Sequence, residues 1–167
     1  MKILVTVASK HGSTGEIGEI IAGVLRDAGD EVISQVPEAV HDVNGFDAVV
    51  IGSAIYAGRW LQPARALVDR QAVELARRPV WVFTSGPIGD PPMPAAESDE
   101  AVDIATCLGA RDHRTFAGRL DRSQLGFMER TVTRAMKAPE GDFRDLDAIR
   151  RWADEIATAL RATEVPA

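Results

Sequence analysis

Cysteine is almost absent from this chain, with Cys107 the single one among 167 residues. One cysteine excludes an internal disulfide and a cysteine-based metal cluster. Lysine is also scarce, because Lys2, Lys10 and Lys137 are the only three and arginine supplies the remaining positive charge. The net charge is −6, which argues against a general binder of nucleic acid or of anionic membranes. We therefore expect no nucleic-acid partner.

Long hydrophobic runs are missing as well. No apolar stretch approaches the roughly 20 residues needed to span a bilayer. The chain opens directly into a strand pattern at Lys2, without the basic and then apolar leader of a secreted protein. These features predict a cytoplasmic protein. A hydrophobic content of 46% fits one globular domain, which we expect over residues 1–162 with a short tail at 163–167.

Strand and helix patterns alternate along the chain. Short apolar runs typical of buried strands occupy residues 3–7, 32–36, 46–52, 80–84 and 114–118. Helical apolar spacing predicts helices over residues 17–25, 63–77, a stretch ending near 108, 125–136 and 146–160. Five strands separated by helices predict an α/β fold with a parallel sheet and right-handed crossovers.

Small and polar residues follow three of the predicted strands. These are Ala8-Ser9, Gly52-Ser53 and Thr84-Ser85-Gly86. Ligands of such sheets bind beyond the carboxyl ends of the strands. None of the three ends carries a metal ligand or paired carboxylates. We therefore expect no metal site and no catalytic side chain, with the chemistry left to a bound cofactor.

The turn after the first strand is the best candidate for an anion site. It consists of Ser9, Lys10, His11, Gly12, Ser13 and Thr14. Free N–H groups and the positive end of the helix dipole favour an anion at the start of the following helix. Gly12 can adopt backbone angles closed to other residues, and the hydroxyls add donors. Ser and Thr at a helix start also serve as plain caps, so the turn alone leaves both interpretations open.

Other phosphate-binding motifs fit this turn less well. A nucleoside-triphosphate P-loop needs G-K-[ST], which is absent, and Gly12, Gly15 and Gly18 do not have the G-x-G-x-x-G spacing of a dinucleotide fingerprint. Receiver domains need acidic residues at the first and third strand ends, and low-molecular-weight phosphatases need a cysteine in this turn. Gly15, Gly18 and Gly23 are more simply explained as close helix–sheet contacts.

Several segments together resemble a known family. SKHGSTGEIG at residues 9–18 resembles the phosphate loop of flavodoxins. VIGSAIYAGRW at residues 50–60 resembles the second flavin loop of the flavodoxin-type, menaquinone-dependent protoporphyrinogen oxidases. Residues 116–120, the Met-containing helix after them, and residues 141–149 with Trp152 extend the similarity over nearly the whole chain. The resemblance implies a flavodoxin-like three-layer sandwich with a five-stranded parallel sheet in the order 2-1-3-4-5.

The resemblance also implies an FMN site. Its phosphate would lie on Ser9, Lys10, His11, Gly12, Ser13 and Thr14. One side of the flavin ring would face Ser53, Ala54, Ile55, Tyr56, Ala57 and Gly58, and the segment runs on to Trp60. The other side and the pyrimidine edge would face Thr84, Ser85, Gly86, Pro87, Ile88 and Gly89, with Asp90 next. The family places the Ala57–Gly58 peptide beside flavin N5. Tyr56 and Trp60 are the candidates to stack on the ring, and Trp60 suits the hydrophobic core equally well.

The implied activity is that of an FMN-dependent oxidoreductase acting on a porphyrinogen or a quinone. A carrier flavodoxin, an NAD(P)H-dependent flavin or quinone reductase, and a deazaflavin in place of FMN stay open. The partner is accordingly a small redox substrate or a redox protein. Near residues 120–137, basic side chains alternate with Asp121 and Glu129, which indicates a solvated helix face rather than a membrane-docking one. Pro91 to Pro94 suit a stiff loop or a lid over the flavin equally well.

Overall fold

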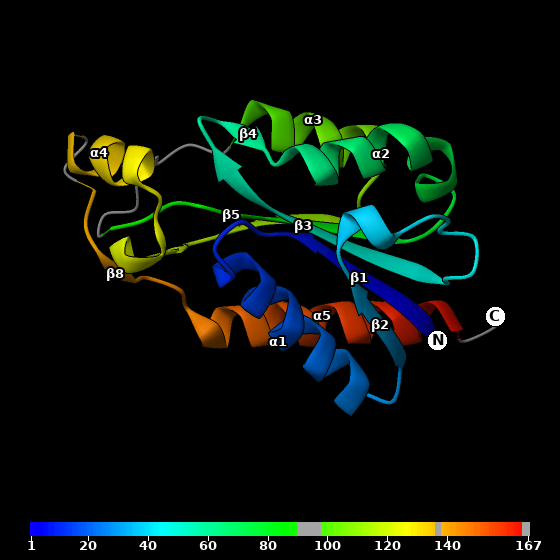
Figure 1. The fold of residues 1–167 in the computed structure, drawn as a ribbon. Coiled ribbons are helices and arrows are strands. Elements are labelled where there is room, and N and C mark those ends of the chain that lie inside the picture. Colours follow the sequence, from blue (N-terminus) through cyan, green and yellow to red (C-terminus); the bar gives the residue numbers. More distant parts are fainter. Residues whose placement is uncertain (90–97, 136–137, 165–167) are drawn as a thin grey trace.

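A parallel sheet forms the centre of the molecule in the computed structural model, which describes residues 1–89, 98–135 and 138–164 (Figure 1). Its parallel strands are β1 (Lys2–Ala8), β2 (Glu31–Gln35), β3 (Ala48–Tyr56), β5 (Val80–Ser85) and β6 (Asp112–Phe116). They lie in the order β2-β1-β3-β5-β6. Counted among the parallel strands alone, this is the order 2-1-3-4-5, so the predicted topology is confirmed.

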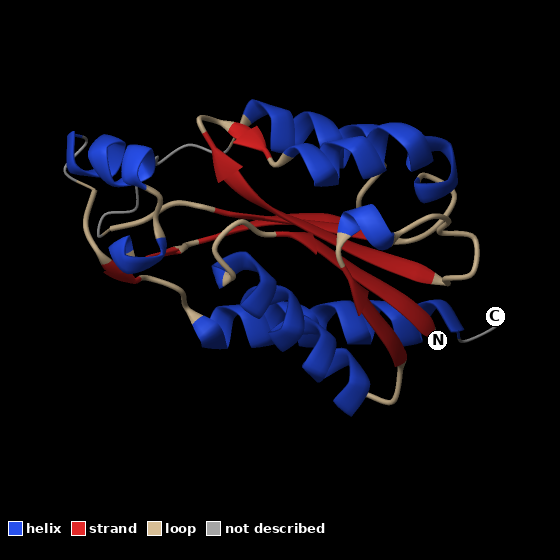
Figure 2. Ribbon diagram, viewed as in Figure 1, coloured by secondary structure: helices blue, strands red, loops and turns tan. Residues whose placement is uncertain are grey.

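Helices cover both faces of this sheet (Figures 1 and 2). One face carries α1 (Ser13–Asp27) and α5 (Leu146–Glu164), and the other carries α2 (Gln62–Leu75) and α3 (Asp99–Cys107). A short 3-10 turn, η1 (Pro37–Ala39), follows β2. The arrangement is the expected three-layer sandwich. No helix in the described ranges has both the length and the apolar character required to cross a membrane.

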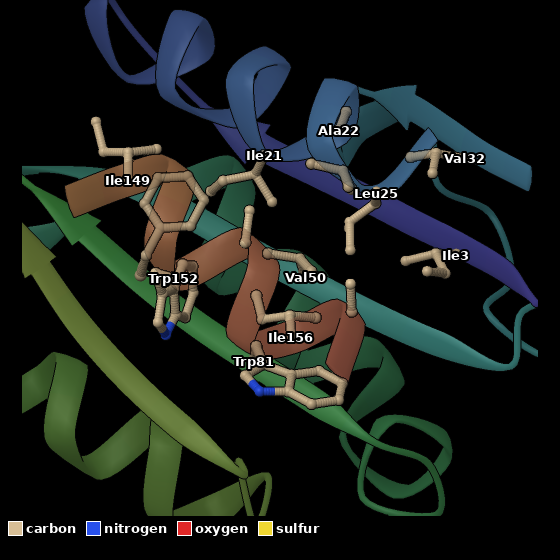
Figure 3. Close-up of a cluster of buried hydrophobic side chains, with 14 of the residues drawn as sticks. Ile3, Ile21, Ala22, Leu25, Val32, Val50, Trp81, Ile149, Trp152 and Ile156 are labelled. Atoms are coloured by element: carbon tan, nitrogen blue, oxygen red, sulfur yellow. The ribbon is translucent and has the colours of Figure 1, made fainter. Parts of the chain in front are cut away.

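The core is split by the sheet into two clusters, and alternate residues of each strand belong to different clusters. On β1, Ile3 and Val5 pack against α1 and α5, whereas Leu4 packs on the side of α2 and α3. Figure 3 shows the first cluster, in which Trp152 of α5 lies beside residues of the sheet. Side chains of a strand point alternately to opposite faces. A strand covered on both faces must therefore be apolar throughout, as the sequence patterns indicated.

Several short elements were not predicted. These are β4 (Arg59–Trp60), β7 (Arg119–Leu120), β8 (Gly141–Asp142) and the 3-10 turn η2 (Arg122–Gln124). β4 pairs antiparallel with the end of β3, and β7 pairs antiparallel with β8. Residues 53–56, expected in a flavin loop, are thus the end of a strand. Two-residue strands are too short to leave a periodicity in the sequence.

The helix expected over residues 125–136 is α4 (Phe127–Ala135). In Figure 1 it lies at the end of the sheet toward which β3 and β5 run, opposite the end that holds the chain termini. Residues 136–137 lie outside the described part of the chain. α4 therefore stands at the edge where ligands of parallel sheets bind.

Candidate cofactor site

A cavity of about 590 Å³ lies at the carboxyl ends of β1, β3 and β5. This volume is within the range of about 300–1,000 Å³ found for small-molecule and cofactor sites. The predicted site residues that line it are Ser9, Lys10, His11, Ser13, Thr14, Ala54, Ile55, Tyr56, Ala57, Ser85, Gly86 and Ile88. Three segments that are far apart in sequence are thus brought to one place.

The remaining predicted residues lie beside the cavity without lining it. These are Gly12, Ser53, Gly58, Thr84, Pro87 and Gly89; Asp90 and Pro91 to Pro94 fall outside the described residues. Ser53 is fully buried, and its Oγ donates to Ala54 O and accepts from Leu61 N–H. Thr84 Oγ1 accepts from Trp60 Nε1 at 3.0 Å. Both hydroxyls therefore form hydrogen bonds within the protein, to groups of β3, β4 and the residue that precedes α2.

Trp60 belongs to the hydrophobic core. Its side chain is 1% exposed and packs in the cluster on the α2 and α3 side of the sheet. The alternative that Trp60 stacks on a flavin ring is therefore wrong, because core packing outweighed its position near the predicted loop. Tyr56, in contrast, is 42% exposed and lines the cavity.

The first turn presents unused hydrogen-bond donors to the cavity. Gly12 is the N-cap of α1 with φ 83°, and no side chain caps the helix. Helical hydrogen bonding begins with Glu16 N–H on Gly12 O, so the preceding N–H groups have no partner within the helix. Ser13 Oγ is buried and has no partner among the described residues. The plain-cap interpretation fails here, and the donors suit an anion such as a phosphate.

A tight hairpin forms a second wall. Tyr56 pairs with Arg59, so Ala57 and Gly58 are a two-residue turn between β3 and β4. Their φ angles are 50° and 76°, and positive φ at both central residues is typical of a type I′ turn. Ser98 Oγ, at the start of α3, donates to Gly58 O at 2.6 Å. The hairpin tip is therefore held from outside the cavity.

The loop after β5 packs directly on this hairpin. A Cβ at Gly86 would lie 2.2 Å from Ile55 Cγ2, so only glycine allows the approach. Gly86 N–H donates to Phe116 O, and Gly118 N–H donates to Pro87 O at 2.7 Å. Glycine thus allows two predicted cofactor loops to contact each other.

Gly18 of α1 packs closely on Val7 of the sheet, whereas Gly23 has no such contact. The expectation of close helix–sheet contact is therefore wrong for Gly23.

The α4 region supplies a third wall that the sequence did not predict. It contributes Gly118, Arg119, Leu120, Asp121, Gln124, Leu125, Met128, Glu129, Thr133 and Ala138. Its charges are exposed or partly exposed, as expected, and several also have partners: Arg119 bonds Glu16, and Arg130 donates to Arg122 O and Ser123 O. A charge-rich amphipathic helix has the same pattern whether its charges pair or face water. The similarity of residues 116–120 to the flavodoxin-type family was the feature of the sequence that pointed to this wall.

Glu129 links this wall to the first turn. Its Oε1 lies 2.5 Å from Lys10 Nζ and 3.2 Å from His11 Nε2. The ion pair with Lys10, helped by the Gly126 N–H, lowers the pKa of Glu129 to about 2. Lys10 Nζ also lies 5.5 Å from the centre of the Tyr56 ring. Burial, followed by the nearby Glu129 charge, raises the pKa of Tyr56.

Arg144 supports the first turn from behind. Its side chain is 5% exposed and donates to Ser13 O at 3.2 Å. It also bonds Glu16 Oε2 at 2.7 Å and Asp142 Oδ2 at 2.6 Å. The hydrogen bond from Arg144 is the main cause that lowers the pKa of both Glu16 and Asp142. This network joins the segment before α5 to the helix start that faces the cavity.

Comparisons with known proteins place this geometry in a family. Residues 4–147 match the family model described as the flavodoxin domain. A comparison with curated proteins finds no match.

Solved structures share the fold at low sequence identity. The rubredoxin oxygen:oxidoreductase of Desulfovibrio gigas has a TM-score of 0.69 at 15% identity, covering 99% of this chain and 37% of that one. A flavodoxin from Archaea has a TM-score of 0.67 at 15% identity, covering 96% of this chain and 99% of that one. Flavodoxin 1 from Bacillus cereus has a TM-score of 0.65 at 14% identity, covering 95% and 98%. The chain thus spans about a third of the oxidoreductase and nearly all of each flavodoxin.

Proposed function

The chain belongs to the flavodoxin domain family, and on that premise we propose that it binds FMN and acts as an electron-transferring oxidoreductase. The observation that carries the proposal is the cavity at the sheet edge, which is polar and rich in donors at one end. Ser13 Oγ, buried and without a described partner, is the most direct sign that a ligand belongs there. A phosphate monoester satisfies that donor set.

The flavin ring would lie in the cavity beside the β3–β4 hairpin and the loop after β5, which contact each other at Ile55 and Gly86. Ala54, Ile55, Ala57, Gly86 and Ile88 offer it small or apolar surface. A bound flavin supplies the redox chemistry, while the protein orients it and tunes its potential. The Ala57–Gly58 peptide, with its positive φ angles, would face flavin N5 by the family pattern.

We propose a porphyrinogen or a quinone as the substrate class. The α4 wall supports an enzyme, because Leu120, Leu125 and Met128 add an apolar surface that the predicted cofactor loops do not include. A flat, largely apolar molecule could approach the flavin along this wall. The resemblance of residues 50–60 to the protoporphyrinogen oxidase branch supports the same class.

Fluorescence titration tests the cofactor. The purified chain should quench FMN fluorescence with a stoichiometry of one, and riboflavin should bind more weakly because it lacks the phosphate. A deazaflavin cofactor titrated in parallel distinguishes the two flavin types. Equal affinity for FMN and riboflavin would place the phosphate outside the first turn and would remove the basis of the assignment.

A carrier flavodoxin is the second candidate. It is supported by the flavodoxin structures that match nearly the whole of both chains. To separate the two, the FMN-loaded protein is reduced and mixed anaerobically with a soluble quinone or with a flavodoxin-accepting redox protein. Catalytic turnover of the quinone or of a porphyrinogen supports the enzyme. Rapid transfer to the protein alone supports the carrier.

A further inference from the structure

A single carboxylate joins the two sides of the cavity mouth. Glu129 is 119 residues from Lys10 in sequence, yet its Oε1 contacts both Lys10 Nζ and His11 Nε2. Its Oε2 accepts the N–H of Gly126 at 3.0 Å, which caps the start of α4. One oxygen thus stabilises the helix, and the other binds the turn that is expected to hold the cofactor phosphate.

The same two side chains would face that phosphate. In the part of the chain that the structure describes, no acidic side chain other than Glu129 pairs with Lys10 or His11. The neighbouring Arg119 is already engaged by Glu16. A phosphate monoester carries close to two negative charges at neutral pH. It would attract Lys10 and His11 and repel the Glu129 carboxylate.

We propose that Glu129 is a resident anion that competes with the cofactor phosphate for Lys10 and His11. Phosphate binding then releases α4 from the first turn, whereas a flavin without phosphate leaves the contact in place. Glu129 thereby sets how strongly the site prefers a phosphorylated flavin and couples that preference to the position of the α4 wall. This inference rests on the proposed FMN function.

The variant Glu129→Gln tests the competition. Glutamine can still accept the Gly126 N–H, so the helix cap is kept while the charge is lost. FMN should bind roughly two- to five-fold more tightly to the variant, the range expected when a partly exposed ion pair is removed. Riboflavin affinity should stay unchanged. In a Lys10→Met background, the gain from Glu129→Gln should shrink, because the cation under competition is gone.

Glu140→Gln is the matched control. Glu140 accepts from Arg122 N–H, and its carboxylate lies 3.7 Å from Arg122 Nη1. The substitution therefore removes one negative charge from the same α4 region, as Glu129→Gln does. Glu140 has no contact with Lys10 or His11 among the described interactions. Its FMN affinity should stay within about two-fold of wild type, the effect expected of a distant, screened charge.

Hydrogen exchange gives a readout independent of affinity. Amides of α4 should exchange faster in the wild type saturated with FMN than in the wild type saturated with riboflavin. The inference is overturned if Glu129→Gln weakens FMN binding, or if FMN and riboflavin change by the same factor. If the wild type binds both flavins and Glu129→Gln behaves like Glu140→Gln, the inference alone fails. If the wild type binds neither flavin, the proposed function fails with it.

Discussion

In the described part of the chain, the buried hydroxyls of Thr6 and Ser13 have no hydrogen-bond partner. Ser13 is one of the residues that line the cavity, and Thr6 is fully buried on β1. An unsatisfied buried polar atom costs about 1–3 kcal/mol. At Ser13 a bound ligand could accept a hydrogen bond from the hydroxyl and so offset this cost. At Thr6 the structure offers no such use.

Ser13→Ala should therefore have opposite effects on folding and binding. Removing the hydroxyl should raise the free energy of unfolding without ligand by about 1 kcal/mol, because a desolvated donor is gone. FMN affinity should fall roughly ten- to a hundred-fold, since each lost charge-assisted hydrogen bond is worth about 1.5–3 kcal/mol. Urea unfolding and FMN titration measure the two quantities.

Thr6→Val is the control for this prediction. It should give a similar gain in unfolding free energy and leave FMN affinity unchanged, because Thr6 does not line the cavity. A loss of FMN affinity in Thr6→Val equal to that in Ser13→Ala would mean that the hydroxyl of Ser13 has no direct role.

Among the elements, the β3–β4 hairpin carries its strain at one identifiable residue. Ala57 has φ 50°, a left-handed conformation that costs an L-residue roughly 1–2 kcal/mol. Gly58, with φ 76°, adopts the same region without a Cβ. The backbone of the turn is therefore unstrained at Gly58 and strained at Ala57. Ala57 lies beside the expected place of the flavin ring.

Substitutions at the two turn positions should act in opposite directions. Ala57→Gly should leave stability unchanged or raise it by up to about 1 kcal/mol, whereas Gly58→Ala should lower it by about 1 kcal/mol. No atom lies within 4 Å of a Cβ built on Gly58, so the loss would come from the backbone alone. Chemical unfolding of the three proteins tests this, and a stabilised Gly58→Ala would contradict the hairpin geometry.

Arg144 joins three elements through carboxylates whose pKa values are lowered. Glu16 and Asp142 have ordinary values of 4.5 and 3.8, and Arg144 lowers both in the folded state. A lowered folded pKa means that the unfolded chain binds protons more readily, so the contribution is present above these ordinary values. It is lost as the pH falls below them.

Arg144→Met should cost about 1–2 kcal/mol at pH 7, a modest loss because Glu16 and Asp142 are half-exposed and screened by water. The difference between wild type and variant should narrow as the pH falls below about 4.5, because the two carboxylates then become protonated and lose their attraction to Arg144. Urea unfolding at several pH values measures it. A difference independent of pH would assign the effect to packing of the Arg144 side chain alone.

At the scale of the whole molecule, cofactor binding and folding are linked, because the cavity walls come from residues spread between Ser9 and Ala138. A ligand that binds only the folded state at 100 times its dissociation constant stabilises it by about 2.7 kcal/mol. For a domain of this size that corresponds to a rise of roughly 5–10 °C in the unfolding midpoint. FMN should produce this rise in a thermal scan. Riboflavin at the same concentration should produce a smaller one, and an equal rise would argue against recognition of the phosphate.

The fold was predictable because its signals are local. Residues 3–7 and 80–84 are continuous apolar runs, and such runs occur where a strand is covered on both faces. The first turn was equally accessible, since Gly12 and the hydroxyl residues stand directly between a strand and a helix. Both features depend on neighbours in the sequence, and their physical consequences follow from backbone geometry.

The α4 wall and the core position of Trp60 could not be predicted from local sequence patterns. Glu129 meets Lys10 only because β7, β8 and the Arg144 network carry α4 back over the first turn. Charges that alternate along a helix do not reveal which of them will find partners. Trp60 follows the hairpin tip by two residues, and only the register of β3 with β4 turns it inward.

The sequence by itself determined the α/β class, the strand order implied by its resemblance, and the edge of the sheet where the cavity lies. Those properties follow from periodicity, turn chemistry and the handedness of parallel connections. Only the tertiary structure decided which charges face the cavity, which polar atoms are left without partners, and how α4 closes one side. Each of these depends on the pairing of residues far apart in the chain, which packing selects and no local pattern records.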